Sequence, residues 1–77
     1  MSATELRQAY YDVLLRQVRS CRYPSPTMMQ RTEEEIRDPD TAEEYIAALL
    51  ELVGSDRYPS PQMLERISNA LVALDGS

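Results

Sequence analysis

The pentapeptide Arg-Tyr-Pro-Ser-Pro occurs twice in the chain, at residues 22–26 and again at residues 57–61. The similarity extends beyond these five residues, because twelve residues between Tyr10 and Arg31 recur unchanged 35 positions later. Chance matches at average composition would account for about two of them. We therefore interpret the chain as a 35-residue internal repeat, with one unit at about 3–38 and the other at about 40–75. Together the units are expected to form one helical domain over residues 1–77.

Each unit is predicted to fold as a helix, a short turn and a second helix. The tyrosine–proline pair ends the first helix, because proline lacks a backbone N–H and disfavours helical geometry in the residue before it. The serine that follows, Ser25 or Ser60, is a preferred N-cap residue. The second proline, Pro26 or Pro61, then takes the first helical position, where a missing N–H costs nothing. The pentapeptide therefore predicts a helix stop followed at once by a helix start.

The remaining boundaries also carry capping signals. Ser2 and Glu5 fit a capping box at the first helix, and Asp38 or Asp40 is expected to cap the third. These signals predict helices at about 3–20, 26–37, 40–53 and 61–74, with no strand. The expected fold is an all-α antiparallel four-helix domain built from two tandem helical hairpins, packed about a pseudo-two-fold axis.

Apolar residues recur at helical spacing in the first, third and fourth helices, whereas the second helix has few of them. The predicted core consists of Leu6, Ala9, Tyr10, Val13, Leu14 and Val18; Met28, Met29 and Ile36; Tyr45, Ile46, Leu49, Leu50, Leu52 and Val53; and Met63, Leu64, Ile67, Ala70, Leu71 and Leu74. Tyr11, Leu15 and Leu52 fall outside the main stripes. Two interpretations remain open for them: a seam between two copies of the chain, or filling of the core from its flanks.

The side-chain inventory excludes several classes of chemistry. All eight basic residues are Arg, there is no His, and Cys21 is the one cysteine. Without His, the chain cannot assemble a Ser–His or Cys–His pair, and it offers almost no ligands for zinc or haem. We therefore expect a non-enzymatic protein without metal or cofactor. The absence of Lys beside abundant Arg, Ala, Leu and Glu indicates a bacterial source with a GC-rich genome.

The cellular location is predicted from the absence of a recognisable signal or membrane-spanning segment. The N-terminus does not resemble a secretory signal, and the longest apolar run, Tyr45–Leu50, is far too short to cross a bilayer. A single thiol is typical of a reducing compartment. Cys21 itself is interpreted as a partly buried, inert residue rather than a reactive one. We expect a cytoplasmic protein that does not bind membranes.

Charge is distributed unevenly along the chain. Residues 1–32 hold five Arg and two acids, whereas residues 33–77 hold three Arg and eleven acids. This acidity argues against nucleic-acid binding, which depends on neutralising phosphates. Three arginines recur at every third position, Arg16, Arg19 and Arg22. We interpret them as positive charge that complements the C-terminus of a helix, rather than as a nucleic-acid contact. The acidic run 33–44 contains Pro39 and no glycine, so it predicts a patch for an Arg-bearing partner rather than a calcium loop.

The candidate partner-binding residues lie around each Tyr-Pro corner: Arg22, Tyr23, Met28 and Met29 in the first unit, and Arg57, Tyr58 and Met63 in the second. One interpretation is that they form apolar ridges that receive a partner. The other is that both tyrosine rings fill the corner between two helices. The arginines would either bond the last helix carbonyls or stack on the tyrosine rings. Both serines are read as caps rather than phosphorylation sites.

These observations predict a small protein–protein interaction module, an adaptor or regulatory subunit that also self-associates as a homodimer. The alternative is an acidic imitator of nucleic acid that blocks a DNA-binding protein. The sequence identifies neither the partner nor the pathway.

Overall fold

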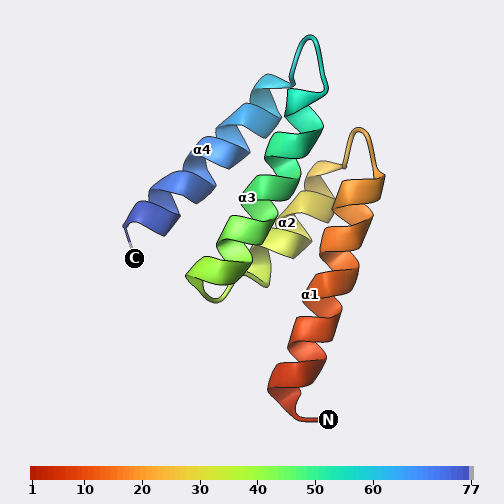
Figure 1. The fold of residues 1–77 in the computed structure, drawn as a ribbon, viewed down its shortest axis with the longest axis vertical. Coiled ribbons are helices and arrows are strands. Elements are labelled where there is room, and N and C mark those ends of the chain that lie inside the picture. The colour runs from red at the N-terminus through yellow and green to blue at the C-terminus, as the bar shows by residue number, and fades with distance from the viewer. Residues whose placement is uncertain (77) are drawn as a thin grey trace. The chain divides into compact units, whose positions relative to one another are not determined.

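The computed structural model describes residues 1–76, which form four α-helices (Figure 1). These helices are α1 (Ala3–Ser20), α2 (Pro26–Glu34), α3 (Pro39–Gly54) and α4 (Pro61–Asp75). The described residues contain no strand, so the predicted all-α class is confirmed. No helix among them is long and apolar enough to cross a membrane.

The helices group into two units, each a hairpin of two helices that run in opposite directions. The first hairpin, Met1–Ile36, holds α1 and α2, and the second hairpin, from Arg37 onward, holds α3 and α4. In each hairpin the two helices pack on each other.

Side-chain caps set the starts of α1 and α3. The Ser2 hydroxyl accepts the Glu5 backbone N–H at 3.2 Å, and the Glu5 carboxylate accepts the Ser2 N–H at 3.4 Å. Asp38, rather than Asp40, is the N-cap of α3, and its carboxylate accepts the Thr41 N–H at 2.8 Å. The predicted capping box at Ser2 is therefore confirmed, and the choice between the two aspartates is resolved.

Helix α2 is three residues shorter than predicted, because it ends at Glu34 instead of residue 37. The Glu35 and Ile36 N–H groups donate to the carbonyls of Thr32 and Glu33, three residues back, at 3.1 and 3.2 Å. These bonds tighten the end of the helix. Asp38 has an extended backbone because it caps α3 and because it precedes Pro39. Helix α2 therefore has to end before Asp38.

The first hairpin buries a different side of α1 from the one predicted. Residues at the buried side are Tyr11, Leu14, Leu15 and Val18. By contrast, Leu6, Tyr10 and Val13 are 55%, 46% and 46% exposed, and Ala9 is exposed too. The predicted stripe is therefore wrong for these four residues and right for Leu14 and Val18. The buried set and the exposed set both have helical spacing, and packing rather than periodicity selects between them. On α2, Met29 and Thr32 are buried, and the Thr32 hydroxyl donates to the Met28 carbonyl at 3.0 Å.

In the second hairpin the interior is supplied mainly by α3. Its buried apolar residues are Ala42, Tyr45, Ile46, Ala48, Leu49 and Val53, and α4 adds Met63 and Ile67. Leu52, Ala70 and Leu74 are half-buried. Three leucines predicted to lie in the core are exposed instead, Leu50 by 50%, Leu64 by 46% and Leu71 by 42%. Each lies one residue beyond a buried or half-buried position, which turns it out of the contact between the two helices.

Candidate interaction site at the two helix turns

The first tyrosine turn, residues 22–26, joins α1 to α2. Helix α1 ends at Ser20, and the N–H of Cys21 donates to the Val18 carbonyl at 3.3 Å. Pro24 is buried beneath the turn. The extended Ser25 then caps α2, because its hydroxyl accepts the Met28 N–H at 3.2 Å.

The second tyrosine turn, residues 57–61, joins α3 to α4 in the same manner. The Ser60 side chain caps α4 by accepting the Met63 N–H at 3.5 Å, and Pro61 takes the first helical position. No described residue of the chain has a positive φ. Both serines therefore act as the predicted caps, and each turn is made with ordinary backbone conformations.

The tyrosine rings point away from the protein interior at both turns. Tyr23 is 69% exposed and Tyr58 is 85% exposed, so neither ring fills the corner between its helices. The guanidinium carbon of Arg22 lies 5.7 Å from the centre of the Tyr23 ring, and that of Arg57 lies 6.0 Å from the Tyr58 ring. Both distances fall in the range of a cation–π contact. The predicted stacking of these arginines on the tyrosine rings is thus present at both turns.

The methionines lie beneath the turns rather than on their surface. Met29 and Met63 are buried, with 3% and 4% exposure, and Met28 is half-buried. Among the seven residues predicted to bind a partner, the ones that reach the surface fully are the two arginine–tyrosine pairs. The methionines are therefore less available to a partner than the four residues of these pairs.

The other charged candidates serve local roles. Arg19 lies in the last turn of α1, where a positive charge is favourable, and both Arg16 and Arg19 are exposed. Asp38 of the acidic run is engaged as the α3 cap. Within residues 1–76, no three His, Cys, Asp or Glu side chains gather closely enough to hold a metal ion. Cys21 is a half-buried free cysteine at the end of α1.

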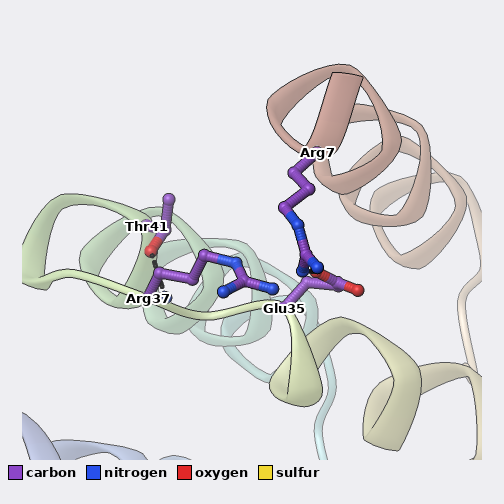
Figure 2. A network of polar contacts seen from close by, with 4 residues as sticks. All are labelled: Arg7, Glu35, Arg37 and Thr41. Carbon is purple, nitrogen blue, oxygen red and sulfur yellow. Dashed lines mark hydrogen bonds and ion pairs between the residues drawn. The ribbon is translucent and has the colours of Figure 1, made fainter. Parts of the chain in front are cut away.

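Two polar contacts lie within single hairpins (Figure 2). In the first hairpin, Nη1 of Arg7 on α1 lies 3.9 Å from Oε2 of Glu35, just past α2. In the second hairpin, the Arg37 N–H donates to Oγ1 of Thr41 at 3.2 Å. The Arg7–Glu35 pair could not be predicted from the sequence, because its members are 28 positions apart and only the antiparallel register of the hairpin brings them together.

No protein family matches the chain, and neither a curated protein nor a solved structure shows significant similarity to it. The functional interpretation therefore depends on the exposed residues of the two turns.

Proposed function

We propose that this chain is a small non-enzymatic protein–protein interaction module, built from two copies of one helical hairpin, that contacts a protein partner through its two tyrosine turns. The observation that carries the proposal is the arginine–tyrosine pair, which is exposed and stacked in the same way at both turns.

Capping explains only part of the repeated pentapeptide. A serine cap and a proline at the first helical position require neither a tyrosine nor an arginine beside them. Tyr23 and Tyr58 contribute little to the interior of the hairpins, since both are largely exposed. Their retention at both turns is accounted for by contact with another molecule.

Tyrosine and arginine, together with tryptophan, are enriched among the residues that contribute most to binding in protein interfaces. A tyrosine ring offers a large contact area with few rotatable bonds, and the stacked guanidinium keeps its hydrogen-bond donors available at the edge of the ring. Because Arg22 and Arg57 are already held near their rings, less side-chain freedom is lost when a partner binds. The donors favour a partner surface that carries carboxylates.

The proposal is tested by affinity capture from an extract of the source organism, quantified by mass spectrometry. The baits are the natural chain, the double variant Tyr23→Ala/Tyr58→Ala, and the control Asp12→Ala, which changes an exposed residue of α1 away from both turns. We expect a partner that the natural chain and the control retain and the double variant loses, while all three baits keep the same melting temperature. An identical set of captured proteins for all three baits would falsify the proposal.

The salt dependence of that binding separates the proposal from the nucleic-acid imitator. Exposed acids on α3, among them Glu43, Glu44 and Glu51, would carry the binding of an imitator. Its affinity would fall steeply with salt and respond to charge-neutralising substitutions at these acids. Contact through the tyrosine turns predicts a shallow salt dependence and no response to the acids.

A further inference from the structure

We propose that the chain bridges two copies of one partner protein, with one copy bound at each tyrosine turn. The inference rests on the proposed function and adds to it that the two turns are equivalent sites, each complete in itself, for the same feature of the partner. The chain then acts as a bivalent connector instead of a ligand with a single contact surface.

The same exposed groups are present at both turns. Each turn carries a tyrosine ring with a guanidinium carbon near its centre, at 5.7 Å for Arg22 and Tyr23 and at 6.0 Å for Arg57 and Tyr58. All four residues are exposed. A partner feature that fits one pair therefore meets the same chemical groups, at nearly the same spacing, at the other pair.

The backbone that carries each pair is also built alike. At both turns a helix ends before the arginine, an extended serine caps the next helix, and a proline takes the first helical position. The hydroxyls of Ser25 and Ser60 accept the N–H groups of Met28 and Met63, which lie three residues further on. The support of each pair is thus set by residues of its own turn.

The differences between the turns lie mostly at less exposed positions. Cys21 precedes the first pentapeptide and Asp56 precedes the second, and both are half-buried. The proline after the tyrosine is buried at Pro24 and half-buried at Pro59. These changes leave the exposed tyrosine and arginine the same, so we expect the two sites to have similar affinities.

Each site is complete within one hairpin (Figure 1). The first turn and the helices on either side of it, α1 and α2, belong to Met1–Ile36, and the second turn lies between α3 and α4 in the unit from Arg37 onward. Each arginine stacks on the tyrosine of its own turn. Because both sites belong to one chain, two bound copies stay close together at a high effective concentration. Bridging is therefore the expected consequence of having the exposed pair twice.

Isothermal titration calorimetry measures how many partner subunits each chain binds. The probe is the protein that the natural chain captures from the extract, after purification, and the titrants are the natural chain, Tyr23→Ala, Tyr58→Ala and the double variant. The matched control is Tyr10→Ala, which removes a tyrosine that is 46% exposed on α1 and lies outside both turns. Circular dichroism melts check that every variant is folded.

We expect the natural chain and the control to saturate at two partner subunits per chain, each single variant at one, and the double variant to give no binding heat. The dissociation constants of the two single variants should lie within about fivefold of each other, because the exposed groups match. On a surface coated densely with the partner, the natural chain should dissociate at least about tenfold more slowly than either single variant, because both turns are then engaged at once.

Saturation of the natural chain at one partner subunit would overturn the inference. In that case, a single variant that binds like the natural chain shows that the other turn alone makes the contact. Two inactive single variants show instead that both turns are needed for one copy. A captured protein identical to this chain would also overturn it, because the turns would then join copies of the chain itself. The proposed function fails only if the double variant keeps the partner, so the module can bind at one turn while the bridging fails.

Discussion

Asp38 and Thr41 bond to each other in both directions at the start of α3. The Thr41 N–H donates to Oδ1 of Asp38 at 2.8 Å, and the Asp38 N–H donates to Oγ1 of Thr41 at 3.3 Å. Together they satisfy two backbone donors that the helix itself cannot pair.

Replacing the cap should therefore destabilise the second hairpin. We expect Asp38→Ala to lower the free energy of unfolding by about 1 kcal/mol, which corresponds to roughly 4–8 °C in melting temperature for a chain of this size. The control is Asp40→Ala, which removes a nearby acid that is exposed and is not the cap. Thermal melts followed by circular dichroism measure both, and equal shifts for the two variants would contradict the assignment of the cap.

Leu49 and Leu50 are neighbours in the sequence with opposite environments, since Leu49 is fully buried and Leu50 is 50% exposed. Leu49→Ala should cost about 2–5 kcal/mol through lost burial and the cavity left behind. Leu50→Ala should change the free energy of unfolding by about 0.5 kcal/mol or less. Urea titrations at a low protein concentration keep self-association out of the comparison. Similar costs for the two variants would mean that the buried face of α3 is misassigned.

Gly54 is the last residue of α3, and it does not need the conformational freedom of glycine. Its φ is not positive, and an added Cβ would meet no atom within 4 Å. Gly54→Ala should therefore raise the free energy of unfolding by about 0.4–1 kcal/mol, chiefly by restricting the unfolded chain. At Gly76 the added Cβ would lie 3.3 Å from the Val72 carbonyl oxygen, so Gly76→Ala should give a smaller gain or none. A gain at Gly76 that matches the one at Gly54 would contradict this argument.

The Arg7–Glu35 ion pair is expected to contribute little to stability. Its atoms are 3.9 Å apart, and the Arg7 side chain is 57% exposed, so water and salt screen the attraction. A double-mutant cycle with Arg7→Gln and Glu35→Gln should give a coupling of about 0.5 kcal/mol or less, and less still in high salt. A coupling well above 1 kcal/mol would show that the pair is more tightly held than this geometry allows.

Helix boundaries could be predicted from the sequence because they depend on residues close together in the chain. Three helices start at the predicted residues. Their starts are set by the capping box at Ser2 and by the serine–proline pairs at Ser25 and Ser60. The end of α2 could not be placed as well, since it has no glycine stop. It is fixed instead by the extended Asp38 that follows.

The buried faces were harder to predict, because two apolar stripes compete on one helix. Tyr10 and Tyr45 occupy matching places 35 residues apart, yet Tyr10 is 46% exposed and Tyr45 is fully buried. Leu15 and Leu50 show the reverse, 7% against 50% exposed. The same residue type at matching places thus has different surroundings in the two hairpins, and the spacing of apolar residues does not predict that difference. The exposure of Tyr23 and Tyr58 at the turns could not be predicted for the same reason, because it depends on whether other side chains pack against the rings.

The chain has no tryptophan, and each hairpin encloses one tyrosine, Tyr11 in the first and Tyr45 in the second. Ultraviolet emission from this protein therefore comes from phenols alone, without energy transfer to an indole. A soluble quencher such as iodide would reach Tyr23 and Tyr58 at once but would reach the enclosed pair only as each hairpin opens. Removing the three exposed rings, those of Tyr10, Tyr23 and Tyr58, would leave one optical reporter per hairpin, so the order in which the two halves melt can be followed without any added dye.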